Sequence, residues 1–393
     1  MKRHLQFAAW VSARGFIFAG YLLAGVFCAS QVAAAQSPTP RLYRATGSEW
    51  IQEVSGTFSA GKYVRVRSSS GSIRIQGAQQ NKITYTIREH VRAATEEGAR
   101  RELAHLKFTT YSSGESVTLR ADCEGSNRGS IDFDVQVPAQ TAQVKLETEG
   151  GAVSATNLSG RVEANTGGGA IQLDQITGVV VAASGGGNIE IGKVGSDVQA
   201  STGGGNIRLV SAGGQVNAKS GGGNLNIGWA KVMTLSTGGG SINVTKCDGQ
   251  MKAETGGGNI DIKDIAGSAQ IETGGGSIHF GPIKGGVRAE TGAGGIIARL
   301  APGGEFTDSR LETSVGDIVV YIPEGLGVNV RAAVEVARGY GIRSEFGDQL
   351  RITNPQGMGP REVYAEGSLN GGGPLLHVHT TTGNIEIKRE ARK

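Results

Sequence analysis

The sequence is dominated by a glycine-containing unit that returns at a nearly constant interval. In STGGGNIRLV a Thr precedes three consecutive glycines, and closely similar stretches occur before and after it along the chain. The Thr or Ser in front of the glycines recurs at steps of 18, 18, 18, 18, 17, 18, 18, 18 and 22 residues. Its positions are Thr148, Thr166, Ser184, Thr202, Ser220, Thr237, Thr255, Thr273, Thr291 and Thr313. A fixed period of this length predicts stacked structural repeats.

Apolar residues alternate with polar residues on both sides of each glycine cluster. Around Thr202, Val198 and Ala200 come before the glycines, and Ile207 and Leu209 come after them. A period of two is typical of β-strands, and no helical spacing fits because glycines interrupt every segment. We therefore predict an all-β fold. It is a single-chain β-solenoid (β-helix) of about ten 18-residue coils, with equivalent strands stacked in parallel about 4.8 Å apart.

Three glycines in a row could bind phosphate, ligate calcium or reverse the chain. A phosphate-binding loop requires Lys followed by Ser or Thr after the glycines, and then a helix; neither follows here. The calcium-binding nonapeptide repeat requires an Asp where this chain has Ile207. We predict a structural role, because a side chain would collide with the turn of the next coil and because we expect the turn to require positive φ, which glycine permits. The glycines that begin these turns are Gly167, Gly185, Gly203, Gly221, Gly238, Gly256 and Gly274.

A polar residue follows most glycine clusters and is expected to stack on its equivalent in the next coil. Stacked amides and hydroxyls form hydrogen-bonded ladders of the kind that stabilise cross-β edges. These residues are Asn188, Asn206, Asn224, Ser241, Asn259 and Ser277. A further apolar position, ten residues after the Thr or Ser, includes Cys247 and predicts another side chain in the core.

Residues 1–35 have the features of an export signal. Basic residues precede an apolar run over 16–35, and Ala33 and Ala35 fit a small-residue cleavage pattern with a mature start near Gln36. An uncleaved membrane anchor is the alternative. Removing this leader lowers the formal net charge from +4 to about +1, because it contains basic residues and no acidic ones. No basic stripe with interleaved aromatic residues occurs, so nucleic acid is not an expected partner.

The chain outside the repeat predicts a cap at each end of the solenoid. Residues 36–140 are expected to form a β-rich N-terminal cap with one helix. The helical pattern is TEEGARRELAHLKF, with Ala99, Leu103 and Leu106 on one face and Thr95 as its cap. Residues 141–320 form the predicted solenoid, and residues 321–393 are expected to form irregular final coils and a C-terminal cap. Caps are needed because an exposed end coil invites edge-to-edge association.

Three features together resemble the bacterial DUF4097 family, which is described as putative adhesins with β-strand repeats. They are the Val137-Pro138 step into the repeat, the serial T-G-G-G-x-I-x-I units, and the ending LNGGGP…TTTGNIEI. The resemblance covers most of the mature chain and rests on repeat motifs. It implies an exported β-solenoid, and it supplies no catalytic residues.

One set of charged residues on the predicted solenoid stands out. Glu254, Glu272 and Glu290 come one residue before the Thr of three consecutive coils, and Glu312 follows less regularly. The alternation points them outward, about 5 Å apart. Carboxylates at that distance recruit a cation or act as the acidic pair of a retaining glycosidase. The alternative is a solvated face that tolerates charge. Earlier coils hold other residues at this position: Asn165, Ala183, Ser201 and Lys219.

Other residues with potential chemistry are isolated. His377 and His379 lie on one face of a predicted strand, as two metal ligands would, but no third ligand is evident nearby. His279 occupies an outward position and is expected to be exposed. Cys123 and Cys247 fall in different regions, and one disulfide between them stays an open alternative. We expect no metal and no cofactor.

These observations predict an exported, non-enzymatic protein of the bacterial cell envelope or exterior. A flat polar face of the solenoid would serve adhesion or binding, with an unidentified polysaccharide or envelope protein as partner. No stable membrane insertion is expected after cleavage of the signal. The first alternative is a carbohydrate-active enzyme, a polysaccharide lyase or glycosidase, that uses the stacked glutamates. The second is a purely structural component of the envelope.

Overall fold

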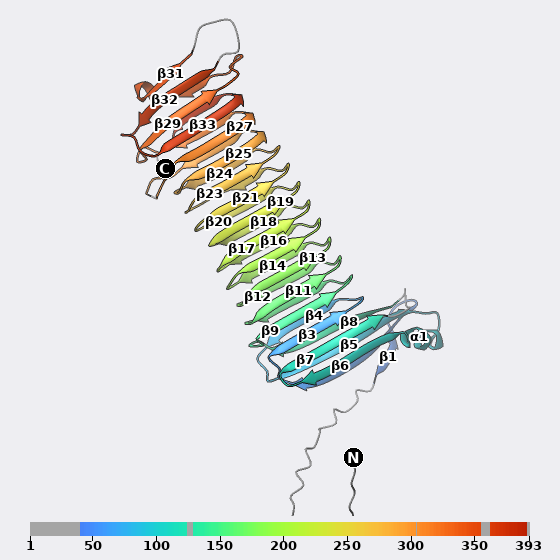
Figure 1. Ribbon diagram of the computed structural model, residues 1–393. Coiled ribbons are helices and arrows are strands. Elements are labelled where there is room, and N and C mark those ends of the chain that lie inside the picture. The colour runs from blue at the N-terminus through green and yellow to red at the C-terminus, as the bar shows by residue number, and fades with distance from the viewer. Residues whose placement is uncertain (1–39, 124–128, 304, 355–361, 391–393) are drawn as a thin grey trace, which may run out of the picture. The chain divides into compact units, whose positions relative to one another are not determined.

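The computed structural model of the chain describes residues 40–123, 129–303, 305–354 and 362–390 (Figure 1). The chain from residue 38 onward forms one compact unit. The predicted export signal, residues 1–35, lies outside the described residues. None of the helices in the described ranges has the length and apolarity that crossing a membrane requires.

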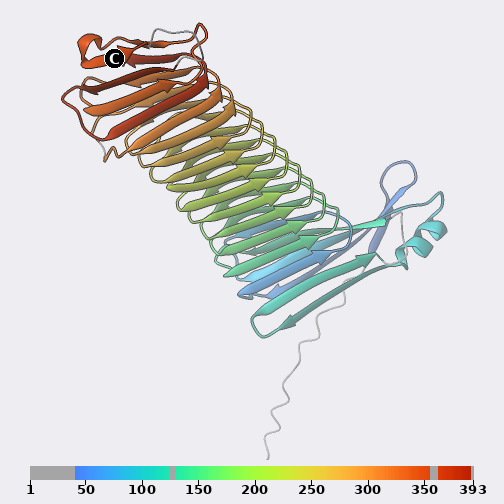
Figure 2. The same cartoon turned by 45° about the horizontal axis from the view of Figure 1, so that its top comes forward.

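Two strands form each central coil, and strands of successive coils pair in parallel to build two long sheets (Figures 1 and 2). In sheet A, whose strands follow the glycines, the central strands are β10 (Val153–Leu158), β12 (Ile171–Ile176), β14 (Ile189–Val194), β16 (Ile207–Ala212), β18 (Leu225–Ala230), β20 (Ile242–Cys247), β22 (Ile260–Ile262), β24 (Ile278–Ile283), β26 (Ile296–Leu300) and β28 (Ile318–Ile322). In sheet B, whose strands precede the glycines, they are β9 (Gln143–Thr148), β11 (Arg161–Thr166), β13 (Val180–Ser184), β15 (Val198–Thr202), β17 (Gln215–Ser220), β19 (Val232–Thr237), β21 (Met251–Thr255), β23 (Ala269–Thr273), β25 (Val287–Ala293) and β27 (Ser309–Val315).

The pairing register keeps equivalent residues of successive coils side by side. Ile207 of β16 pairs with Ile189 of β14 on one side and with Leu225 of β18 on the other. All three side chains point between the sheets and are at most 1% exposed. The buried hydrophobic residues form one continuous cluster that runs from Val64 to Ile387. The all-β solenoid that the 18-residue period predicts is confirmed.

The close approach of stacked turns explains the triple glycines. A Cβ atom on Gly256, the first of its cluster, would lie within 3.0 Å of the carbonyl oxygen of Gly238 in the preceding coil. A Cβ atom on the third, Gly258, would meet the Gly240 carbonyl in the same way, whereas the middle Gly257 has open space around it. The expected positive φ is wrong here, because no triple glycine between residues 167 and 276 has φ between +20° and +160°. Steric room, and not backbone handedness, requires glycine at these turns.

The Thr or Ser before the glycines points into the core and is hydrogen-bonded on both sides. Thr255 is 6% exposed, and its Oγ1 donates to the carbonyl oxygen of Gly240 at 2.7 Å. The same hydroxyl accepts from the backbone N–H of Gly258 at 3.2 Å. This pair of bonds recurs in each coil from Thr166 to Thr273. A hydroxyl satisfies one buried acceptor and one donor at once, which explains why only Thr and Ser occupy this position.

The polar residues after the glycines stack as predicted, but their hydrogen bonds differ from the expected ones. The side-chain oxygen of Asn188 accepts from the backbone N–H of Asn206 at 2.8 Å, and Asn206 accepts likewise from Asn224. Asn259 accepts from the backbone N–H of Ser277 at 2.9 Å. The bonds run from backbone to side chain, so each amide satisfies a turn N–H of the next coil instead of another amide.

At the N-terminal end the order of the coils in space differs from their order in the chain. The elements are β1 (Arg41–Arg44), β2 (Glu49–Ser59), β3 (Tyr63–Ser68), β4 (Ile73–Ala78), β5 (Lys82–Arg92), α1 (Glu96–Leu103), β6 (Leu106–Ser113), β7 (Ser116–Cys123) and β8 (Gly129–Pro138). Strands β3 and β4 pair in parallel with β9 and β10, with Ser68 opposite Thr148 and Ile73 opposite Val153. On their other side they pair in parallel with β7 and β8. The structure thus places residues 63–78 in register with the repeat.

Antiparallel strands extend both sheets beyond this first pair of coils. In sheet A, β8 pairs with β5, β5 with β2 and β2 with β1. In sheet B, β7 pairs with β6. The predicted helix is present as α1; the Thr95 side chain caps it by accepting from the N–H of Gly98, and Ala99 and Leu103 are buried. The helix ends at Leu103, earlier than the sequence pattern predicts, and Leu106 lies in β6 instead of on the helix face.

At the C-terminal end, too, the order of the strands in space differs from their order in the chain. Its elements are β29 (Val328–Val334), β30 (Ile342–Ser344), the 3₁₀ helix η1 (Gly347–Gln349), β31 (Leu350–Thr353), β32 (Val363–Leu369), β33 (Leu375–Thr382) and β34 (Ile385–Arg389). Strand β33 lies between β27 and β29, parallel to both, and β34 lies between β28 and β30. Strands β32 and β31 continue sheet B in antiparallel orientation. The last two strands of the chain are therefore inserted between two earlier coils.

Candidate binding groove on sheet B

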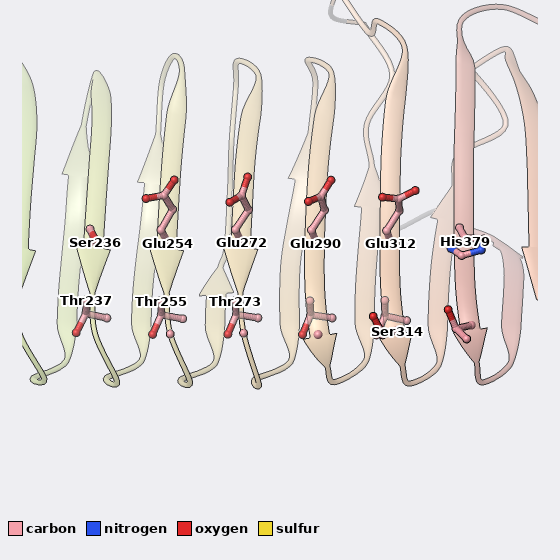
Figure 3. Close-up of a pocket in the computed structure, with 16 residues that line it drawn as sticks. Ser236, Thr237, Glu254, Thr255, Glu272, Thr273, Glu290, Glu312, Ser314 and His379 are labelled. Carbon is pink, nitrogen blue, oxygen red and sulfur yellow. The ribbon is translucent and has the colours of Figure 1, made fainter.

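The predicted glutamates lie in one row on the outer face of sheet B (Figure 3). Glu254, Glu272 and Glu290 are direct partners on β21, β23 and β25. Glu312 of β27 pairs with Glu290 in the same register, because the residues that lengthen this repeat lie between β26 and β27. Their side chains are partly exposed, from 38% at Glu254 to 27% at Glu312. We call Glu254, Glu272, Glu290 and Glu312 the carboxylate row.

The row continues onto a residue that the sequence analysis did not connect with it. His379 of β33 is the direct partner of Glu312, although 67 positions separate them in the chain. The signal was present in the sequence, since His379 stands one residue before Thr380 in the TTTGNIEI ending, as each glutamate stands before its Thr. Only the insertion of β33 beside β27 brings the two together.

Each carboxylate has a partner two residues earlier on its own strand. Lys252 Nζ lies 2.6 Å from Glu254 Oε1, and Gln270 Nε2 donates to Glu272 Oε1 at 2.6 Å. The other two carboxylates pair with arginines: the distances are 2.7 Å for Arg288–Glu290 and 2.9 Å for Arg310–Glu312. The sequence carried this signal as well, because residues two apart on a strand lie on the same face. Partly exposed pairs of this kind contribute about 0–1 kcal/mol each to stability, so their main effect is on the charge that the face displays.

An open groove of about 800 Å³ runs beside the carboxylate row and crosses strands β19 to β33. Its wall is the carboxylate row with Ser236 and His379, and its floor contains the Thr and first Gly of successive coils, such as Thr273 and Gly274. The floor is low because the Thr side chain points inward and the glycine has none. We call this feature the sheet B groove. From Thr255 to Gly292 each coil contributes a Thr followed by a Gly to the floor, whereas Ser314 and Thr381 take the place of the glycine in the last two coils.

The two histidines at the end of the groove stack on each other. The ring centroids of His377 and His379 are 6.3 Å apart, with planes inclined by 7°. His377 Nδ1 lies 3.7 Å from Glu312 Oε1, and His379 Nε2 lies 3.9 Å from Glu335 Oε2. Burial, with the charge of Arg310 adding to it, lowers the pKa of His377. In the part of the chain that the structure describes, no three His, Cys, Asp or Glu side chains converge as metal ligands would.

The remaining candidate residues have structural partners. His279 is half-exposed, as expected, and its Nδ1 lies 3.2 Å from Asp261 Oδ1. Cys247 is fully buried in the core, and burial raises the pKa of its thiol. Cys123 and Cys247 are both free thiols, so the disulfide between them is not formed.

No protein-family model and no curated protein matches the chain. Among solved structures, a "putative cell adhesion protein" from Clostridium sporogenes ATCC 15579 is 10% identical, with a TM-score of 0.18, over 86% of this chain and 100% of that one. A "putative adhesin" from Bacteroides fragilis NCTC 9343 is 11% identical, with a TM-score of 0.25, over 86% and 97%. Another, from Parabacteroides merdae ATCC 43184, is 11% identical, with a TM-score of 0.24, over 65% and 95%. Membership of the DUF4097 family, which the sequence resembles, stays a proposal.

Proposed function

We propose that this chain is an exported, non-enzymatic binding protein of the bacterial envelope or exterior, and that the sheet B groove holds an extended polysaccharide. The observation that supports the proposal is the continuity of the groove across successive coils, three of which, those of Glu254, Glu272 and Glu290, offer the same wall glutamate and the same Thr-Gly floor. A surface that repeats at the spacing of stacked strands, about 4.8 Å, suits a ligand that is itself a linear polymer. The export follows from the leader predicted at residues 1–35.

The chemistry of the groove wall favours binding to hydroxyl groups. A carboxylate accepts hydrogen bonds at about four lone-pair positions, and the partner on its own strand occupies only part of this capacity. Sugar hydroxyls are donors that match the rest. A hydrogen bond to a charged group contributes about 1.5–3 kcal/mol, so several in a row give useful affinity even on an open surface.

A second candidate function rests on the stacking of the carboxylates. Glutamates on adjacent strands resemble the acidic pair that a retaining glycosidase uses. Lys252, Arg288 and Arg310 make three of the four carboxylates members of ion pairs, and this favours a binding surface over an acid–base pair. Enzymes also bury most of a small ligand in a concave site, whereas the sheet B groove is open along its length.

Replacing the four glutamates of the carboxylate row together by Gln tests the proposal. We expect binding to polysaccharides in a glycan screen to weaken by about tenfold or more, because the charge-assisted hydrogen bonds become neutral ones. The matched control is Glu190→Gln on the exposed face of sheet A, which leaves the groove intact. Glycan binding that survives the fourfold replacement unchanged excludes the groove as the site. Polysaccharide cleavage by the wild-type protein that disappears in the variant supports the enzyme instead, and capture of an envelope protein without any glycan assigns the partner to that class.

A further inference from the structure

Strand β5 carries two adjacent titratable residues on opposite faces of sheet A, away from the sheet B groove. His90 points to the outer face, between β2 and β8. Its Nδ1 lies 3.2 Å from Glu49 Oε1 on β2, and its Nε2 lies 3.3 Å from Asp132 Oδ2 on β8. Asp132 is fixed in turn, because its Oδ1 accepts from the backbone N–H of Ser72 at 2.7 Å. The imidazole thus joins three strands and the turn that leads into β4.

Glu89 points to the inner face and is 2% exposed. Gln52 of β2 donates to Glu89 Oε2 from its Nε2 at 2.6 Å. Burial raises the pKa of this carboxyl, because a charge there would be removed from water. The pKa of the Cys123 thiol on β7 is raised chiefly by burial, and the charge of Glu89 adds to this rise.

The neighbouring pair of charges shows what a permanent cation does in the same place. Arg88 lies on the outer face of β5 two residues before His90. Its Nε is 3.1 Å from Glu53 on β2, and its Nη1 is 3.8 Å from Asp134 on β8. The carboxylate–cation–carboxylate arrangement therefore occurs twice across the same three strands, once with arginine and once with histidine. Arginine stays charged at all accessible pH values, whereas histidine titrates near neutrality.

We propose that Glu89 and His90 form a pH-sensitive latch that holds β2, and with it β1, on the terminal coil and releases both strands as the pH rises. Strand β5 is the only strand that joins β2 to the rest of sheet A in the described part of the chain. Loss of the imidazolium leaves Glu49 and Asp132 without the cation between them. Ionisation of Glu89 places a charge in the core beside β2. Deprotonation of His90 and ionisation of Glu89 therefore both weaken the pairing of β2 with β5.

The direction of the pH dependence follows from proton linkage. The nearby carboxylate of Asp132, and next that of Glu49, raises the pKa of His90 against the opposing effect of burial. A group with a raised pKa stabilises the folded state while its proton is bound, and this stabilisation is lost as the pH rises through the folded pKa. Glu89 has the same sign. Burial acts to raise the pKa of Asp132, but its interactions with His90 and Ser72 outweigh this effect and lower the pKa, so the stabilisation that Asp132 provides is lost at acid pH. We therefore expect β2 to stay paired with β5 at pH values above those at which Asp132 gains a proton and below those at which His90 and Glu89 lose theirs.

Hydrogen exchange of β2 as a function of pH tests the latch. Protection factors, corrected for the intrinsic exchange rate, are measured on the full chain from about pH 5 to about pH 9. We expect the protection of β2 to fall by up to tenfold for each unit by which the folded pKa values exceed the ordinary ones, while the central strand β16 stays unchanged. Protection of β2 that does not change with pH overturns the proposal.

Two variants separate the latch from a general loss of stability. His90→Arg copies the Arg88 arrangement, and combined with Glu89→Gln it is expected to keep β2 protected at the alkaline end. The control His279→Gln removes a half-exposed histidine of sheet A with a single carboxylate partner, and it should retain the wild-type profile. If the double variant loses protection with rising pH as the wild type does, the two residues are not the latch.

Discussion

The Gly258→Ala protein is expected to be destabilised by about 3 kcal/mol, at the upper end of the usual cost of over-packing. The added methyl group would lie within 3.0 Å of the Gly240 carbonyl in the preceding coil, and the obstacle is backbone that cannot rotate away. Relief requires the two coils to separate, which breaks parallel hydrogen bonds on both sides of the turn. The free energy of unfolding from urea titration measures the loss.

The same turn supplies the matched control. Gly257→Ala adds a methyl group with no atom within 4 Å and at a φ outside the left-handed region. The stability of this variant should stay equal to the wild type or rise by up to about 1 kcal/mol, because alanine restricts the unfolded chain. Equal losses in the Gly257→Ala and Gly258→Ala proteins would show that glycine is required for its backbone freedom, and the steric account of the turn would be wrong.

Thr255→Val is expected to cost about 1–3 kcal/mol with little change in side-chain volume. The substitution leaves the Gly240 carbonyl and the Gly258 N–H without the hydroxyl that bonds both of them in the wild type. A buried polar group that loses its partner carries its full desolvation cost. Urea titration gives the total effect, and hydrogen exchange should show the largest loss of protection at the Gly258 amide.

Serine provides the control at this position. Thr255→Ser keeps the hydroxyl, and Ser184 and Ser220 make the same two hydrogen bonds in their own coils. We expect this variant to lose less than the valine variant, because only a methyl group is removed. A serine variant as unstable as the valine variant would assign the effect to packing of the methyl group.

The carboxylate row and the cations beside it could be predicted from the sequence, whereas the sheet B groove could not. The placement of Glu254, Glu272 and Glu290 in one row is a consequence of period-two alternation within a fixed 18-residue repeat. The cations beside these glutamates are equally predictable from the sequence, since Arg288 stands two residues before Glu290 and residues two apart on a strand lie on the same face. The groove could not be predicted in the same way. It exists because the inward-pointing Thr and the glycine that follows it, which has no side chain, together leave a low floor beside the carboxylate row.

The sequence by itself determined the coil: its length, its two strands, its core positions and its glycine turns. These are local properties, because each repeat must match the one before it and the same residues return every 18 positions. Only the tertiary structure decided how the ends are closed. Residues 63–78 lie between β7–β8 and β9–β10, and β33–β34 lie between β27–β28 and β29–β30. Parallel pairing joins strands that are distant in the chain. Because several strands have the same alternation of apolar and polar residues, each could pair with more than one other strand. The order of the strands in the chain therefore does not specify which of them are neighbours in the sheet.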